Sequence, residues 1–153
     1  MKQKLLICDC DGVLTPRHSF YSENGKVLKM FCSDDSYAIK KFKKIGYKVI
    51  IMTIDSDGYK ITKKRCQDWN VDPILTDDKA KEIEIIKKSD LYDCIIYVGN
   101  APEDLLVIDY VDIFVAPKDS RSEVINFQNS KLKIVDVNGG DGVLDSIFAI
   151  IQK

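Results

Sequence analysis

Two aspartates that directly follow an apolar segment give the first indication of chemistry in this chain. In the stretch "LLICDCDGVLTP", from Leu5 to Pro16, Asp9 and Asp11 are one residue apart and Gly12 follows them. Placing two like charges together costs free energy unless a cation or a reacting group uses them. A single aspartate after a strand is usually a loop or cap residue, whereas this pair predicts a functional site.

Further polar residues follow other apolar segments. Thr53 ends "VIIMT", where its hydroxyl and the neighbouring backbone N–H groups are suited to hold a phosphate. Lys79 begins a predicted helix after "LTDD" and either neutralises a phosphate or is a solvated helix start. Asn100 and Asp104 follow "IYVG" and carry oxygens that can help to hold a metal ion. Because Mg²⁺ prefers oxygen ligands, the whole set predicts a magnesium-assisted phosphoryl-transfer site.

Alternating strands and helices must position these residues. Near-continuous apolar runs, typical of strands covered on both faces, lie at 4–8, 47–53, 94–98 and 111–115, with a short edge strand at 134–137. Helical patterns lie between and after them, at 34–45, 58–69, 79–89, 102–108 and 142–152. This alternation predicts an α/β, Rossmann-like, doubly wound fold, in which a mostly parallel sheet carries helices on both faces.

One segment departs from the alternation. Residues 16–31 contain "HSFYSENGKVLKMF", in which Asn24-Gly25 is a strong hairpin signal. A hairpin inserted directly after the first strand lies over the C-terminal end of that strand, where open α/β sheets bind ligands. We therefore expect a β-hairpin flap at about 16–31, above Asp9 and Asp11, within a single domain spanning 1–153.

Composition limits the class of protein. The 153 residues suffice for one domain with its own core. A net charge of −1 without a long basic stripe argues against nucleic acid as a partner. No apolar run approaches the roughly 18 residues of a membrane span, and the N-terminus lacks a signal-peptide core, so no membrane partner is expected. Five scattered cysteines predict reduced thiols in a cytoplasmic protein.

The order of these motifs resembles the haloacid dehalogenase (HAD) superfamily of phosphatases. Its four motifs are matched, in order, by Asp9-x-Asp11-Gly12-Val13-Leu14-Thr15, Thr53, Lys79 and Gly99-Asn100-x-x-x-Asp104. The segments "FYSENGKVLKMF", "DDSYAIKKFKKIGYKVIIMT" and "NGGDGVLD" extend the similarity over nearly the whole chain and resemble the small capless branch. That branch contains 3-deoxy-manno-octulosonate 8-phosphate phosphatase and the nonulosonate 9-phosphate phosphatases, of lipopolysaccharide and sialic acid biosynthesis.

The resemblance implies a phosphoric monoester hydrolase that cleaves a sugar-acid phosphate. Asp9 would attack phosphorus and become an aspartyl phosphate. Asp11 would protonate the leaving oxygen and then deprotonate the attacking water. Thr53, Ile54 and Lys79 would bind the phosphoryl group, whose charge must be stabilised in the transition state.

The resemblance also implies a cofactor and an assembly. Mg²⁺ would be bound by Asp9, by the main-chain carbonyl of Asp11, and by Asn100 and Asp104 of the fourth motif. Members of the branch are typically tetramers in which the hairpin and the C-terminal tail help to complete a neighbour's site. The implied partners are therefore a small-molecule sugar phosphate and further copies in a homotetramer.

Three positions depart from the pattern of the family. Asn100, followed by Ala101, replaces the usual aspartate ligand, and an amide oxygen coordinates Mg²⁺ without adding charge. Ile54-Asp55 replaces the Gly-Arg or Gly-Glu that commonly follows the second motif. Asp145 stands where the family often has an arginine, which reverses the charge at a position suited to grip an anionic substrate.

These departures leave two alternatives open. One is a catalytically weakened or inactive HAD-like domain that binds a sugar phosphate or a partner such as a sugar cytidylyltransferase, to which this domain is fused in some relatives. The other is a phospho-accepting receiver domain, which also combines acidic residues, a threonine and a lysine, with Asp55 as the phosphorylated residue. The hairpin and the Asp-x-Asp spacing have no place in a receiver domain.

Overall fold

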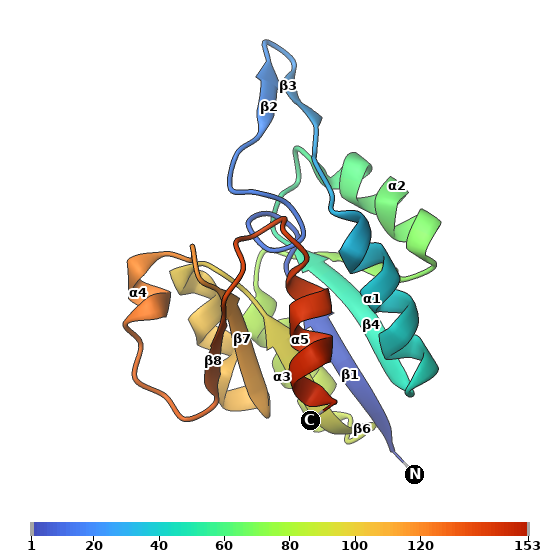
Figure 1. Cartoon of the computed structure of the whole chain (residues 1–153), viewed down its shortest axis with the longest axis vertical. Coiled ribbons are helices and arrows are strands. Elements are labelled where there is room, and N and C mark those ends of the chain that lie inside the picture. The colour runs from blue at the N-terminus through green and yellow to red at the C-terminus, as the bar shows by residue number, and fades with distance from the viewer. Residues whose placement is uncertain (1, 153) are drawn as a thin grey trace.

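A parallel sheet of six strands forms the centre of the computed structural model, which describes residues 2–152 (Figure 1). Its order is β5-β4-β1-β6-β7-β8, and each neighbouring pair is parallel. The strands are β1 (Gln3–Cys8), β4 (Tyr47–Thr53), β5 (Asp72–Leu75), β6 (Tyr92–Val98), β7 (Ile113–Pro117) and β8 (Leu132–Val135). The predicted α/β, doubly wound architecture is confirmed.

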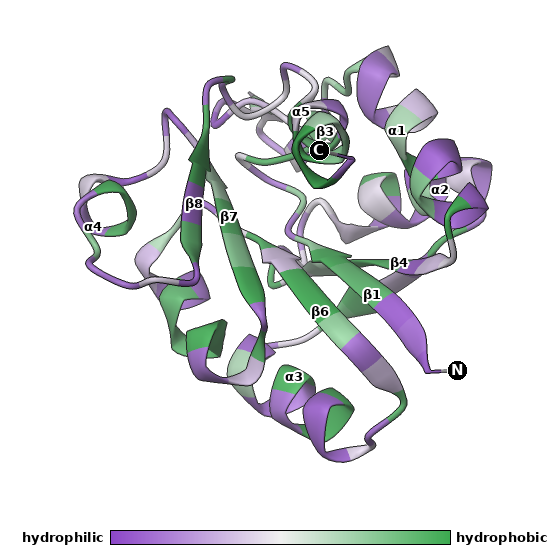
Figure 2. Cartoon of the chain, turned by 60° about the horizontal axis from the view of Figure 1, so that its bottom comes forward, coloured by the Kyte–Doolittle hydropathy of each residue, from purple (hydrophilic) through white to green (hydrophobic). Residues whose placement is uncertain are grey.

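Helices cover both faces of the sheet. One face packs against α1 (Ser33–Lys44), α2 (Tyr59–Trp69) and α5 (Val143–Ile151). The other packs against α3 (Lys79–Lys88), the 3₁₀ helix η1 (Pro102–Tyr110) and α4 (Ser122–Ile125). In Figure 2, strands β1, β6 and β7 are mostly hydrophobic between these layers. This pattern fits strands that are buried on both faces.

Strand β1 shows how the sheet divides the core. Leu6 and Cys8 pack into the cluster on one face, whereas Leu5 and Ile7 pack into the cluster on the other, because successive side chains of a strand point to opposite faces. All four are fully buried. Because this apolar run fills the centre of the sheet, the aspartates that follow it, Asp9 and Asp11, lie beyond the end of β1.

The order of the strands places the site. The chain runs from β1 outward to β4 and β5 and then returns to β6 on the other side of β1. Cys8 is in register with Ile51 of β4 and with Val98 of β6. The segments that follow these three strands therefore leave the sheet at one edge, at the switch point where open α/β sheets bind ligands.

Strand β5 and helix α4 were not predicted, and a third element, η1, was predicted but is a different type of helix. Strand β5 has the sequence "DPIL", whose Asp72 and Pro73 are unusual in strands; Pro73 is tolerated because β5 is an edge strand that pairs with β4 alone. Helix α4 is only four residues long. The helix expected at 102–108 is a 3₁₀ helix, with Pro102 in its first turn.

The expected hairpin is present and stands away from the sheet (Figure 1). It consists of β2 (Phe20–Ser22) and β3 (Gly25–Leu28), which pair antiparallel. Ser22 pairs with Gly25, so the turn is formed by residues 23–24 rather than by Asn24-Gly25. Gly25 follows the turn with φ +98°, a conformation that favours glycine.

Candidate active site

Asp9 lies directly beyond β1, and only one of its two carboxylate oxygens, Oδ1, has partners among residues 2–152. Its backbone N–H donates to the carbonyl of Val98 (2.9 Å), which continues the pairing of β1 with β6. Its Oδ1 accepts a hydrogen bond from the N–H of Cys10 (2.8 Å) and lies 3.0 Å from Lys79 Nζ. No described residue donates to Oδ2, and the residue lines two adjoining cavities. One oxygen of a largely buried carboxylate is therefore free for a ligand.

The surroundings of Asp9 disfavour its charge. Burial and the nearby carboxylate of Asp104 raise the pKa of Asp9 to about 7, although Lys79 and the N–H of Cys10 act in the opposite direction. A further cation beside Asp9 would favour the ionised carboxylate, which is the form that can act as a nucleophile.

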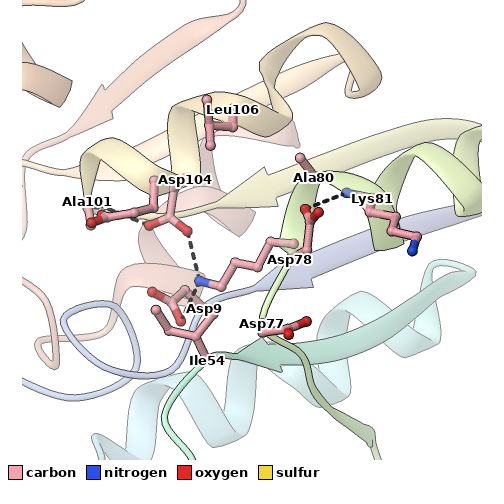
Figure 3. Close-up of a pocket in the computed structure, with 11 residues that line it drawn as sticks. Asp9, Ile54, Asp77, Asp78, Ala80, Lys81, Ala101, Asp104 and Leu106 are labelled. Carbon is pink, nitrogen blue, oxygen red and sulfur yellow. Dashed lines mark hydrogen bonds and ion pairs between the residues drawn. The ribbon is translucent and has the colours of Figure 1, made fainter.

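Lys79 is fixed beside Asp9 by a second carboxylate. The Lys79 ammonium lies 2.8 Å from Asp104 Oδ1 and only 7% of its side chain is exposed. The ammonium thus lies between Asp104 and Asp9, both of which are labelled in Figure 3. A buried ammonium between two carboxylates keeps its charge, and accordingly the pKa of Lys79 is raised by these partners in spite of its burial.

The contacts of Asp104 differ from the expected role of a metal ligand. Asp104 is 1% exposed. Besides Lys79, Oδ1 accepts a hydrogen bond from the hydroxyl of Tyr97, and Oδ2 accepts from the N–H groups of Asn100 and Ala101 (3.0 Å each). Both oxygens are thus already bound within the protein. Asp104 positions Lys79 and the start of η1.

Asn100 brings an unpartnered oxygen to the same place. The residue is 6% exposed, and its Oδ1 has no hydrogen-bond partner among residues 2–152. It lines a cavity together with Asp9 and Asp11. Gly12 permits this approach: it has φ +83°, and a Cβ there would lie 2.1 Å from Asn100 Nδ2. A buried, unsatisfied acceptor costs free energy unless a ligand uses it.

The donor atoms at this place fit a hard cation. Asp9 and Asp11 supply carboxylates and Asn100 supplies an amide oxygen, and Mg²⁺ prefers oxygen ligands of this kind. Within residues 2–152, no three side chains of His, Cys, Asp or Glu gather into a metal-binding group. A third protein ligand therefore has to be an amide or a backbone oxygen, which is what Asn100 and the carbonyl of Asp11 can provide.

Thr53 and Ile54 lie where the sequence predicts, at the end of β4. Thr53 is 1% exposed, and its hydroxyl accepts a hydrogen bond from the N–H of Asp55 (3.1 Å). Both Thr53 and Ile54 line the cavity that contains Asp9 and Asp11. The structure thus brings the strand ends of β1, β4 and β6 together around one cavity of about 450 Å³.

Asp11 is held by Lys29, at the end of the hairpin. This contact was not predicted from the sequence. Lys29 follows β3, and its ammonium lies 3.0 Å from Asp11 Oδ2 and 2.8 Å from Asp55 Oδ2. Only 2% of the Lys29 side chain is exposed. The ammonium also donates to the hydroxyl of Thr62 (2.9 Å). A lysine in an amphipathic hairpin is usually a solvated residue, so the sequence carried no signal for this contact.

Two aspartates that depart from the family pattern, Asp55 and Asp145, form ion pairs with lysines of this chain. Asp55 is paired with Lys26 (2.7 Å) as well as with Lys29, and despite burial these hydrogen bonds hold the pKa of Asp55 well below its usual range. These contacts give no support to Asp55 as the phosphorylated residue of a receiver domain. Asp145 lies on α5 and pairs with Lys41 of α1, away from the residues that line the two cavities.

Known proteins that are similar in sequence include a sugar cytidylyltransferase. No sequence-family model matches the chain. N-acylneuraminate cytidylyltransferase A from Danio rerio is 28% identical over 130 residues, which are 80% of this chain. The chain spans only 29% of that relative's length.

The similarity to solved structures extends over almost the whole chain. The cobalt-bound deoxy-D-mannose-octulosonate 8-phosphate phosphatase of Haemophilus influenzae has a TM-score of 0.85 at 24% identity, covering 98% of this chain and 87% of that one. The 3-deoxy-D-manno-octulosonate 8-phosphate phosphatase of Moraxella catarrhalis, in complex with magnesium, phosphate and the KDO molecule, has a TM-score of 0.83 at 21% identity, covering 97% and 85%.

These matches confirm the predicted resemblance at the level of the fold: the chain has the fold of these two phosphatases. None of the helices in the described residues is both long and apolar enough to span a membrane.

Proposed function

We propose that this chain, which has the fold of the capless HAD phosphatases, hydrolyses a sugar-acid phosphate of the 3-deoxy-manno-octulosonate 8-phosphate or nonulosonate 9-phosphate type. The observation that carries the proposal is the position of Asp9, a buried carboxylate with Lys79 at Oδ1 and no donor at Oδ2. The substrate class is supported by the names of the Haemophilus and Moraxella proteins.

In the first step, Asp9 Oδ2 attacks phosphorus, the bond from phosphorus to the sugar oxygen breaks, and an aspartyl phosphate forms. Asp11 protonates the leaving oxygen, and in the second step it accepts a proton from the water that attacks the aspartyl phosphate. Thr53, Ile54 and Lys79 bind the phosphoryl oxygens. Because Lys79 is held by Asp104 before substrate arrives, its charge needs no rearrangement to stabilise the transition state.

The same residues would hold a divalent cation. We propose that Asp9, the main-chain carbonyl of Asp11 and Asn100 bind Mg²⁺, with Asp104 as a positioning residue for Lys79 rather than a direct ligand. The cation would reduce the repulsion between the phosphate and Asp9. The orphaned Asn100 Oδ1 supports this proposal, as do the magnesium and cobalt complexes of the two structural relatives.

A second candidate is a domain that binds a sugar phosphate or a protein partner without turnover. The observation that favours it is the match to the Danio rerio cytidylyltransferase, of whose length this chain spans 29%. An amide in place of a carboxylate at position 100 also lowers the charge available to a cation. Phosphate release separates the two candidates.

We further propose a single-domain, cytoplasmic homotetramer. Phe20, Tyr21, Leu28 and Met30 expose 56–69% of their surface on and beside the hairpin, and apolar side chains gathered in this way often mark a protein contact. All five cysteines are free, as expected for a reducing compartment.

Light scattering tests the assembly and should give the mass of four chains. The double variant Phe20→Ser with Leu28→Ser should give smaller species. A monomeric parent protein would contradict the assembly.

The decisive experiment measures Mg²⁺-dependent phosphate release from the two sugar-acid phosphates. Asp9→Asn should lower turnover by about a thousandfold or more while circular dichroism shows an intact fold. Asp93→Asn, which changes an exposed aspartate in the same way, is the matched control and should retain activity. Phosphate release by Asp9→Asn at the parent rate would exclude the mechanism.

Asn100→Asp tests whether the metal position limits activity. Activity in the parent protein would show that an amide at position 100 suffices for the cation. Activity only in Asn100→Asp would identify a catalyst that lacks one ligand charge. If neither protein releases phosphate from either substrate, the binding function becomes the better account.

A further inference from the structure

The two cavities that meet at Asp9 differ in the balance of charge in their linings. In the cavity that contains Asp9 and Asp11, the three carboxylates, which include Asp55, are balanced by three cationic side chains: Arg17, Lys26 and Arg121. They come from the loop after the first motif, from the hairpin and from the loop between β7 and α4. The chain as a whole has a net charge of −1, so this gathering of cations is local rather than a general property.

The other cavity is acidic. It measures about 640 Å³ and is lined by Asp77, Asp78 and Glu103 as well as by Asp9. Figure 3 shows Asp77 and Asp78 among the residues that line this cavity with Asp9. Lys79, one of its two cations, is already paired with two carboxylates. Carboxylates outnumber cations in this cavity but not in the cavity with the arginines, so a second anionic group on the substrate is less favoured here than beside the arginines.

Of the three cations, the two arginines are the ones whose charge is not neutralised by a close carboxylate of residues 2–152. Lys26 lies 2.7 Å from Asp55 Oδ2 and is thereby neutralised. Arg17 has only a long ion pair, with Nε 3.9 Å from Asp119 Oδ2. No carboxylate of residues 2–152 lies within 4.0 Å of the Arg121 guanidinium, whereas Lys26, Lys29 and Lys79 each pair with at least one.

Backbone contacts bring the two arginines to the same cavity, although about a hundred residues separate them. The N–H of Arg121 donates to the carbonyl of Asn100 (3.0 Å), which fixes Arg121 beside the end of β6. Asp119, two residues earlier, accepts a hydrogen bond from the N–H of Gly139 (2.8 Å) and faces Arg17. The loop that carries Arg121 is therefore anchored next to the loop that carries Arg17.

We propose that Arg17 and Arg121 bind the carboxylate of the substrate and so select a phosphate ester whose leaving group is an acid. A guanidinium offers a planar pair of N–H donors that matches a carboxylate. The phosphate lies at Asp9 and Lys79, and the acid arm of the sugar extends toward the arginines and away from the acidic cavity. The inference rests on the proposed phosphatase function and assigns its specificity to two residues.

The test compares a sugar-acid phosphate with a hexose 6-phosphate, which carries no carboxylate, in Arg17→Gln, Arg121→Gln and the double variant. Each single variant should raise KM for the sugar-acid phosphate about tenfold or more, the usual effect of losing a charged hydrogen bond. The kcat for both substrates and the KM for the hexose phosphate should not change. Lys81→Gln, which removes a cation from the acidic cavity, is the matched control and should leave both KM values unchanged.

A binding measurement keeps this inference separate from the phosphatase proposal. Calorimetry follows the phosphate-free sugar acid binding to the parent protein and to the double variant in the presence of Mg²⁺, and it needs no turnover. Arginine-dependent binding without any hydrolysis would support the acid-binding site and overturn the phosphatase function. Hydrolysis with equal KM effects on both substrates, or with none, would overturn the role of the arginines and leave the phosphatase intact.

Discussion

The nucleophile and the acid/base candidate are held by two very different parts of the molecule. Asp9 rests on the central strands and is flanked by Lys79, Asp104 and Tyr97, all of them buried. Asp11 is held through Lys29, which the projecting hairpin supplies. A two-stranded hairpin is marginally stable by itself. The comparison teaches that one half of the site is pre-organised by the core, whereas the other depends on how the hairpin docks.

The docking of the hairpin uses charge rather than apolar packing. Lys26 and Lys29 pair with Asp55 in the loop after β4. Asp57 in the same loop accepts hydrogen bonds from the N–H of Lys26 (3.0 Å) and from the hydroxyl of Tyr21 (3.1 Å). Contacts with Asp57 are exposed to solvent and are therefore weak. Removing Asp104 from the core half should accordingly cost much more stability than removing Asp57 from the hairpin half.

Asp104→Ala should give the largest effect. It leaves the buried Lys79 with one carboxylate instead of two and leaves the Tyr97 hydroxyl without its acceptor. Breaking a buried ion pair in this way destabilises proteins by about 3–5 kcal/mol. Urea unfolding followed by circular dichroism measures the change. A loss below about 1 kcal/mol would remove the distinction between the two halves.

Asp35→Asn tests a buried carboxylate that has no cation. Asp35 on α1 is 1% exposed, its Oδ1 accepts a hydrogen bond from the N–H of Leu144 (2.7 Å), and burial raises its pKa to about 7. Because the folded pKa lies above the unfolded value, the folded state binds the extra proton between about pH 4 and pH 7. The free energy of unfolding therefore falls as pH rises through this window, by up to about 1.4 kcal/mol per pH unit.

The asparagine variant keeps an acceptor for Leu144 without the charge. We expect its free energy of unfolding to be flatter between pH 4 and pH 7 and to exceed that of the parent protein above pH 7. Chemical unfolding at a series of pH values measures both. Parallel curves for the two proteins would show that Asp35 is ionised in the folded protein at no cost.

Tyr97→Phe is a smaller change in the core half. It removes only the hydroxyl that donates to Asp104, and the ring remains packed against Phe114. A hydrogen bond to a charged group contributes about 1.5–3 kcal/mol, so we expect a loss of about 2 kcal/mol in urea unfolding. No loss would indicate that Lys79 and the two backbone N–H groups satisfy Asp104 by themselves.

Asp57→Ala should give the smallest effect, below about 1 kcal/mol, because Asp57 is exposed and so are its hydrogen bonds to the hairpin. Its consequence should be local: the backbone N–H of Lys26 loses its acceptor, and its hydrogen exchange should become faster. A global loss as large as that of Asp104→Ala would show that the hairpin supports the whole fold.

Strongly periodic segments were predicted well, and weakly patterned ones were not. The apolar runs of β1, β4 and β6 were identified, and their strands lie within two residues of the expected bounds. Strand β5 was missed because "DPIL" has the composition of a loop, and it forms only through pairing with β4. In such a case tertiary contacts override local propensity.

The sequence by itself determined the central strands of the sheet and the gathering of Asp9, Asp11, Thr53 and Asn100 at one edge of it. The physical reason is that parallel strands with crossover helices place all their carboxyl ends on the same side. A residue known to follow a buried strand is therefore already located in space, without knowledge of any side-chain contact.

Only the tertiary structure decided what each charged side chain touches. Asp104 is bound by four donors, Asp55 is paired with the hairpin, and Arg17 and Arg121 meet at one cavity. Ion pairs form between side chains within about 4 Å, and these segments are far apart along the chain. Their distances depend on the packing of loops and the hairpin, on which residue type and spacing carry no information.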